Sequence, residues 1–157
     1  MAERTIPIDS PGAYDIPAGL MSGGSIFVWE AKGKITAVQA RRLAAKGTSE
    51  VFDAGVLKLP LTVRPLRAGA RIRPFGVSAG TNTRNAPAGE KKVKEILIDR
   101  KIARDDRWGR PVVCDAEGVI LWIPGVLRSA HAPVTPRTRN TALLRIRSTN
   151  RHDPILC

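Results

Sequence analysis

Short runs in which apolar and polar residues alternate, separated by turn residues, recur along most of the chain. Near the N-terminus they predict three strands in the stretches RTIPI, AYDIP and SIFVWE, with SPG, PAG and SGG as the turns. Another strand is predicted in LPLTVRPL, where apolar Leu61 and Val63 stand on either side of Thr62. This part of the chain therefore predicts mainly strands and turns.

The second half adds a hairpin and a last strand. The stretch PVVCDAEGVILWIPG holds two apolar runs joined by the turn residues Asp115 to Gly118, a pattern typical of hairpins. A short strand-like piece surrounds Ile72, and TALLRIR, residues 141–147, predicts the final strand. The stretch STNRHDPILC that ends the sequence reads as a loose tail.

Two segments have the periodicity of helices. One runs from about Thr36 to Lys46, and Gly47 is its expected C-cap, because a residue without Cβ adopts positive φ at low cost. The other runs from Glu90 to Lys101. Since strands and helices do not follow strict βαβ alternation, we expect an α+β fold of mainly antiparallel strands with two or three helices.

The length of 157 residues suggests one domain, or one domain with an appendage. We expect residues 1–50 to form an N-terminal β-rich segment with one helix. Residues 51–147 form the expected main domain, and residues 148–157 the tail. Residues 78–89 are mostly small or polar and read as a long loop, a kind of segment that is often functional or disordered.

The net charge of +12 changes the picture, because it is concentrated in one part of the chain. Residues 61–111 carry 13 basic and 5 acidic side chains, a balance of +8, whereas residues 1–60 balance to +1 and residues 112–157 to +3. Such a patch attracts polyanions through counterion release. The lysine-rich helix lacks the exposed bulky apolar face used at membrane interfaces, so nucleic acid is favoured over anionic membrane.

The most basic stretch is GEKKVKEILIDRKIARDDRWGRPVV, residues 89–113. In its helix Val93, Ile96 and Leu97 form a narrow apolar stripe, and the lysines lie off this stripe. The basic run continues beyond the helix, where two aspartates can pair with some of the arginines. Exposed ion pairs contribute only about 0–1 kcal/mol. Phosphate contact by Lys and forked Arg groups is therefore favoured, with an ordinary solvated face as the alternative.

As one ordered set, these elements resemble the C-terminal region of bacterial tRNA(Ile)-lysidine synthetases over roughly residues 50–147. That family has a strand ending in Arg, a Gly-Asp-Arg turn, Pro-x-Gly, a Lys-Lys helix, an IDRKIPR-like exit, a distal Arg and a strand pair ending in WVPG. This chain offers Arg64 and Arg67, then Gly69 to Arg71, Pro74 to Gly76, Lys91 and Lys92, Ile98 to Arg104, Arg107 or Arg110, and finally Trp122 to Gly125. The resemblance implies a PheT/TilS-like fold.

The chain departs from this family pattern in three places. Ala70 replaces the usual Asp, so any contact which that acid makes is absent. Ala103 replaces the usual Pro, which predicts a less rigid helix exit. Residues 79–89 look like an insertion before the lysines.

The resemblance also implies a tRNA-binding role, in which this region holds the tRNA body for a separate catalytic domain. That domain would use ATP and lysine to modify the wobble cytidine of the anticodon. The residues we expect to bind tRNA are Arg64, Arg67, Arg71, Lys91, Lys92, Lys94, Lys101, Arg104, Arg107, Arg110 and Arg128.

No catalytic site is predicted in this chain, and no cofactor. The family's phosphate loop is of the Ser-Gly-Gly-x-Asp-Ser type, and the nearest match, SGGSIF at Ser22 to Phe27, lacks the Asp and precedes no helix. We expect Ser22 to Ser25 to be a turn before a strand. The catalytic lysidine-synthetase domain is then an expected partner, in cis or in trans.

The remaining candidate residues favour structural roles. Two separated histidines, His131 and His152, and two separated cysteines do not supply the three or four convergent ligands of a metal site. Cys114 is expected in the core, and Trp108 is expected to cap the core at the helix exit, with stacking on a sugar or base as the alternative. The chain lacks a signal-peptide pattern and a stretch long enough to span a membrane, which indicates a cytoplasmic protein.

Two other functions fit the same residues. One is a small basic structural RNA-binding or ribosome-associated protein, and the other is a module that docks a separate catalytic chain through residues 1–50. The ordered family motifs favour a lysidine-synthetase domain over the first of these.

Overall fold

Two antiparallel sheets form the body of the protein in the computed structural model, which describes residues 5–16, 25–45, 47–74 and 90–148. The larger sheet has five strands. In spatial order they are β1 (Ile6–Ile8), β5 (Leu61–Pro65), β8 (Pro111–Cys114), β9 (Ile120–Ile123) and β10 (Leu127–Arg128). The predicted hairpin is confirmed, because β8 and β9 pair as neighbours.

The smaller sheet has four strands. In spatial order they are β2 (Gly12–Ile16), β3 (Ser25–Lys32), β11 (Thr141–Ser148) and β4 (Ser49–Asp53). The predicted last strand, β11, is central: each of its residues pairs with β3, and its first five also pair with β4. Of the predicted turn at Ser22–Ser25, only Ser25, the first residue of β3, belongs to the described residues.

The two sheets pack face to face over one hydrophobic core. Large side chains from both contribute, with Phe27, Phe52 and Leu144 on the smaller sheet and Val63 and Trp122 on the larger, all at most 1% exposed. Burial of this apolar surface is the main term that stabilises the sandwich. Trp122 belongs to the stretch Trp122 to Gly125, which corresponds to the family's WVPG, and its position in the core explains why a large apolar residue stands there.

A second core lies on the other face of the five-stranded sheet. The helix α2 (Val93–Asp99) places its predicted stripe, Val93, Ile96 and Leu97, against Val112 and Cys114 of β8. All four residues of β8 are buried, because alternate side chains point into the two cores. The core position predicted for Cys114 is confirmed, and Trp108 packs against the same cluster, as expected.

The predicted second helix is wrong at its N-terminal end. Lys91 and Lys92 form the short strand β7 (Lys91–Lys92), which pairs with β6 (Arg71–Ile72) in a separate two-stranded ribbon. The ladder hydrogen bonds to β6 compete with a further helical turn, a tertiary contact that local sequence pattern does not report. Ile72 is buried beneath the ribbon and joins it to the second core.

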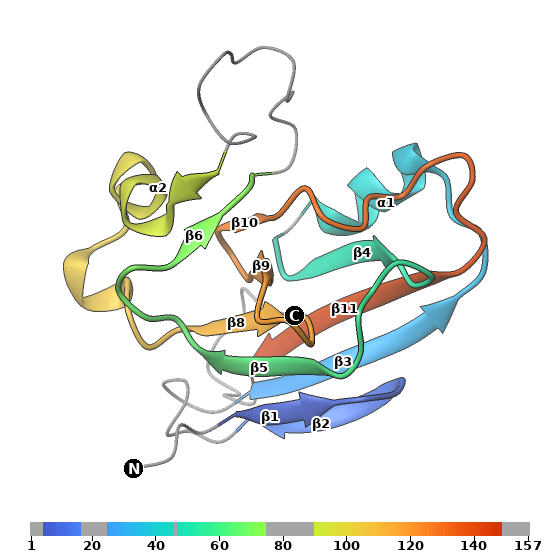
Figure 1. The fold of residues 1–157 in the computed structure, drawn as a ribbon, viewed down its shortest axis with the longest axis horizontal. Coiled ribbons are helices and arrows are strands. Elements are labelled where there is room, and N and C mark those ends of the chain that lie inside the picture. Colours follow the sequence, from blue (N-terminus) through green and yellow to red (C-terminus); the bar gives the residue numbers. More distant parts are fainter. Residues whose placement is uncertain (1–4, 17–24, 46, 75–89, 149–157) are drawn as a thin grey trace.

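The first helix, α1 (Ala37–Ala44), is confirmed within two residues. Its N-terminus is a capping box, in which the Gln39 N–H donates to Thr36 Oγ1 at 3.1 Å and the Thr36 N–H donates to Gln39 Oε1 at 2.9 Å. The predicted C-cap is wrong by two residues: Ala45, with φ −58°, caps the helix, and Gly47, with φ +75°, lies in the turn that follows. Figure 1 shows α1 and α2 at opposite ends of the molecule.

Strands from the first 50 residues take part in both sheets. β1 pairs with β5 in the larger sheet, and β3 pairs with β11 in the smaller one. The boundary predicted after residue 50 falls inside β4. The segments 1–50 and 51–147 therefore complete the same two sheets, whereas residues 79–89 and the tail after Ser148 lie outside the described residues.

The α+β class with mainly antiparallel strands is confirmed. Among the described residues no helix is long and apolar enough to cross a membrane.

Candidate nucleic-acid interface

The ribbon of β6 and β7 brings two predicted site residues directly opposite each other. Arg71 on β6 pairs in register with Lys92 on β7, and both side chains are exposed. Like charges in directly opposed positions destabilise a ribbon unless an anion lies between or over them. The ribbon therefore holds two cations side by side on the surface.

The end of helix α2 places Lys101 in a conformation that Gly usually occupies. The Ile102 N–H donates to the Leu97 carbonyl at 3.0 Å, and the Lys101 N–H donates to the Ile98 carbonyl at 2.9 Å. These two bonds define a Schellman motif, and Lys101 takes its left-handed position with φ +58°. A side chain at that position costs about 1 kcal/mol relative to Gly. The exposed ammonium group is therefore held at the helix end against a backbone penalty.

The helix exit divides the predicted arginines into two kinds. Arg104 is exposed and begins a 3₁₀ turn, Arg104–Asp106. Arg107 is half-buried, and its Nε donates to the Ile102 carbonyl at 2.9 Å. Arg110 is also half-buried, and burial lowers the pKa of its guanidinium. The latter two therefore hold the connection in place, and Arg104 is the arginine of this segment that is presented to solvent.

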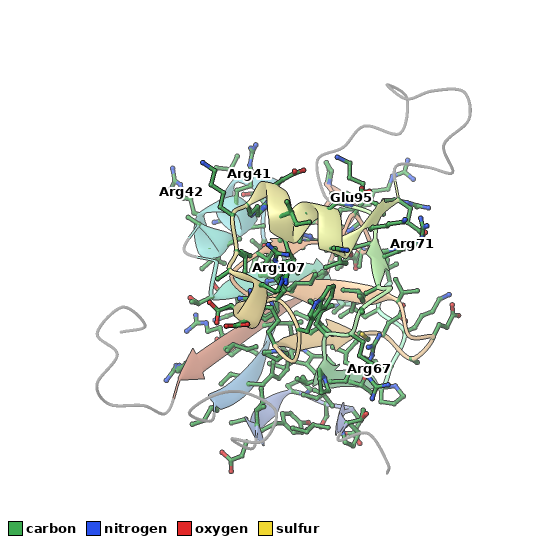
Figure 2. The ribbon with its side chains drawn as sticks, turned by 90° about the vertical axis from the view of Figure 1, so that its left-hand side faces the viewer. Arg41, Arg42, Arg67, Arg71, Glu95 and Arg107 are labelled. Carbon is green, nitrogen blue, oxygen red and sulfur yellow. The ribbon has the colours of Figure 1, made fainter. Side chains whose placement is uncertain are left out.

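Figure 2 shows Glu95 on α2, Arg71 beside the helix on β6 and the half-buried Arg107 just below the helix, whereas Arg67 lies farther away. Within the described part of the chain, six of the predicted cations are exposed and have no ion-pair partner: Arg71, Lys91, Lys92, Lys94, Lys101 and Arg104. We call these six residues the α2 surface. Unpaired exposed ammonium and guanidinium groups are free to meet phosphates.

Beside the α2 surface, a hollow of about 370 Å³ opens over β5 and β6. We call it the arginine hollow, and the residues of its lining that matter here are Arg64, Arg71, Arg73, Glu90, Ile120 and His131. Burial lowers the pKa of His131, and so does the positive charge of Arg73, whereas Asp115 acts in the opposite direction. Sequence analysis predicted Arg64 and Arg71 as site residues but did not include Arg73 or His131.

Arg128 differs from every other predicted site residue, because it is 9% exposed and bonded to the protein on all sides. Its guanidinium donates to the carbonyls of Val51 at 2.6 Å, Ser129 at 2.9 Å and His131 at 2.7 Å. It lies 3.8 Å from a carboxylate oxygen of Glu50 and 4.1 Å from the ring centroid of Phe52. Burial lowers its pKa to about 10.

The prediction that Arg128 contacts a ligand therefore does not agree with its surroundings. The sequence shows only a basic residue after a strand, and the depth of that position depends on how β10 meets β4. We exclude Arg128 from the α2 surface. In the described part of the chain, no group of three or more His, Cys, Asp or Glu side chains is placed to hold a metal ion.

Two solved structures share this arrangement. An N-terminal fragment of the phenylalanyl-tRNA synthetase β-subunit from Pyrococcus horikoshii superposes with a TM-score of 0.56 at 18% identity, covering 76% of this chain and 38% of that chain. This likeness shows the fold alone. The crystal structure of a TilS C-terminal domain superposes with a TM-score of 0.66 at 29% identity, covering 94% of this chain and 99% of that chain. The fold is thus one that occurs in proteins of both kinds.

The sequence comparison assigns the chain to one family among the proteins that share this fold. The family model described as the TilS substrate C-terminal domain matches residues 61–146, more than half of the chain. The chain belongs to this family, and the predicted resemblance and PheT/TilS-like fold are confirmed.

Curated relatives match the chain over a small part of their own length. The tRNA(Ile)-lysidine synthase of Geobacter sulfurreducens is 31% identical over 140 residues, which is 89% of this chain and 26% of that protein. That of Geobacillus kaustophilus is 45% identical over 80 residues, 51% of this chain and 15% of that protein. The bifunctional protein TilS/HprT of Listeria innocua is 38% identical over 95 residues, 60% of this chain and 13% of that protein.

Proposed function

We propose that the chain is a tRNA-binding domain that holds the body of a tRNA for lysidine formation by a catalytic domain. The observation that carries the proposal is the α2 surface, six exposed cations gathered on β6, β7, α2 and the turn after it. None of the six has an ion pair within the described residues, and two of them, Arg71 and Lys92, lie directly opposite each other. Family membership supplies the choice of tRNA among polyanions.

The form of the α2 surface favours structured RNA over a single strand. Proteins that bind single strands stack the bases on exposed aromatic side chains. Here Trp122 and Trp29 lie in the core, and Trp108 packs against the second core at the helix exit. The exposed groups around α2 are ammonium and guanidinium groups, which suit the regularly spaced phosphates of a helical stem.

The proposal assigns catalysis and tRNA binding to different parts of the enzyme. ATP and lysine are used by the catalytic domain, in cis or in trans, and the present chain contributes affinity for the substrate. Incubation of the chain with tRNA, ATP and labelled lysine is expected to give no incorporation. Turnover by the pure chain would contradict this division of labour.

The binding experiment measures the affinity of the chain for a tRNA at several salt concentrations. With about four to six phosphate contacts, log K is expected to fall with log[salt] at a slope of about −0.9 per contact on a duplex stem. An unstructured RNA of equal length serves as the competitor and should bind more weakly. Salt-insensitive binding, or a preference for the unstructured strand, would overturn the proposal.

A structural RNA-binding or ribosome-associated role remains the second candidate. The same assay separates the two, because that alternative predicts equal affinity for a tRNA and for an unrelated duplex of the same length. Discrimination in favour of the tRNA supports the lysidine-synthetase role.

A further inference from the structure

The arginine hollow differs from the α2 surface in shape and in charge balance. Three guanidinium groups, from Arg64, Arg71 and Arg73, and one carboxylate, from Glu90, line a concave site. Their charges sum to +2, because three positive groups face one negative group. No hydrogen bond or ion pair joins these four side chains to another side chain in the described ranges.

The backbone around the hollow is fixed by hydrogen bonds. The Ala130 N–H donates to the Arg73 carbonyl at 2.7 Å, and the neighbouring residues Pro74 and Ser129 form an antiparallel bridge. The His131 N–H donates to Ser129 Oγ at 3.2 Å, and the His131 carbonyl accepts a bond from buried Arg128. Arg73 and His131, which lie far apart in the sequence, are thus held on the same rim.

We infer that the arginine hollow binds the terminal phosphate monoester of a nucleic-acid strand. The inference rests on the proposed function and names one group of that substrate. A phosphate monoester carries about −1.5 to −2 charges at pH 7 and presents three acceptor oxygens, which match the net charge of +2. Forked guanidinium groups bind such oxygens in pairs.

The shape of the site distinguishes a terminal phosphate from an internal one. A phosphodiester inside a strand carries one negative charge and is flanked by sugars on both sides, which suits an open surface such as that around α2. A terminal phosphate projects from the strand end and can enter a concave site. Ile72 and Ile120, both buried, form the apolar floor of the hollow.

His131 reports on occupancy of the hollow. Burial and the cations Arg73, Arg128 and Lys58 favour its neutral form, whereas Asp115 favours the charged form; the other charged groups of the hollow are Arg64, Arg71 and Glu90. A bound dianion adds negative charge beside the ring, so the pKa of His131 should rise on binding. The chain has two histidines, His131 and His152, so two imidazole signals suffice to read the result.

The first experiment follows both imidazole signals by NMR while inorganic phosphate is added to the full chain, with His152→Gln used for assignment. We expect the His131 signal to shift saturably and its pKa to rise, while His152 stays unchanged. Arg73→Gln should abolish the response, and Arg137→Gln, an exposed arginine outside the hollow, should preserve it. An unchanged His131, or equal shifts at both histidines, would overturn the inference.

The second experiment compares RNA hairpins that carry a phosphate at the 5′ end, at the 3′ end or at neither. We expect a terminal phosphate at one of the two ends to raise affinity by at least about tenfold, and Arg73→Gln to remove the gain. Equal affinity for all three hairpins would refute the hollow as a terminal-phosphate site while leaving tRNA binding by the α2 surface intact. Conversely, a phosphate response at His131 without tRNA affinity would refute the proposed function alone.

Discussion

Two groups of basic residues that look alike in the sequence have opposite surroundings in the structure. Arg128 is buried, with carbonyl partners, a carboxylate and an aromatic ring around its guanidinium. The cations of the α2 surface are exposed, and none has an ion pair within the described residues. A buried cation must have its partners in the protein, whereas an exposed one is available to a ligand. The contrast separates a stabilising role from a binding role, and it can be tested from both sides.

The largest effect is expected on stability, when the buried Arg128 is replaced. Arg128→Ala should lower the free energy of unfolding by about 3–5 kcal/mol, because it leaves Glu50 and three carbonyls without their partner. Urea denaturation measures the change. Arg128→Lys keeps the charge but not the fork, and should recover only part of the stability. A variant that unfolds like the wild type but no longer binds RNA would place Arg128 in the binding surface after all.

Substitutions in the α2 surface should weaken tRNA binding and leave stability almost unchanged. Replacing Lys91, Lys92 and Lys94 together by Gln should weaken tRNA binding by about 2 kcal/mol, roughly thirtyfold, if each side chain contributes somewhat under 1 kcal/mol. The salt slope should become shallower by about 0.9 for each phosphate that the variant no longer neutralises. The melting temperature should stay near that of the wild type, because all three side chains are exposed.

The matched control replaces the same amount of charge elsewhere. Arg137, Arg139 and Arg147 are exposed and lie outside the α2 surface and the arginine hollow. Their triple Gln variant should bind tRNA much more like the wild type. If both triple variants bind equally weakly, the net charge of the chain matters and the α2 surface does not.

A smaller effect tests stability and binding at a single residue. Lys101→Gly removes a side chain from a left-handed backbone position, so the free energy of unfolding should rise by about 1 kcal/mol. The same change removes one exposed ammonium group, so tRNA affinity should fall. Lys101→Asn is the matched variant, because Asn also tolerates this conformation. A gain in stability with unchanged tRNA affinity would remove Lys101 from the α2 surface.

The smallest effect concerns the partner of Arg128. Burial raises the pKa of Glu50 above its usual value of 4.5, although Arg128 opposes the shift. The folded state therefore holds the Glu50 proton to higher pH than the unfolded state, and the free energy of unfolding should fall as the pH rises through the window between the two pKa values. Denaturation at several pH values should show this fall relative to Glu50→Gln, which cannot titrate. If the difference in unfolding free energy between the wild type and Glu50→Gln stays constant across that window, the prediction is contradicted.

Local sequence pattern predicted most strands because alternation reports which side chains face a core. It also predicted the α2 stripe, whose spacing survives although the helix is shorter than expected. It could not predict that Lys91 and Lys92 leave the helix, because the cause is hydrogen bonding to β6, about 20 residues earlier in the chain. The arginine hollow was missed in part for the same reason, since His131 reaches it only through the bridge between Pro74 and Ser129.

The exchange of strands between the two halves of the chain sets the smallest piece that can fold. The region matched by the family model begins at residue 61, yet its β5 and β11 each need a neighbour from the first 50 residues. A fragment trimmed to the matched region would leave β5 as an open edge of the larger sheet, keep only β11 of the smaller sheet, and remove Phe27, Trp29 and Phe52 from the core. Such edges pair readily with other chains and cause aggregation. The unit recognised by sequence similarity is therefore smaller than the unit of folding.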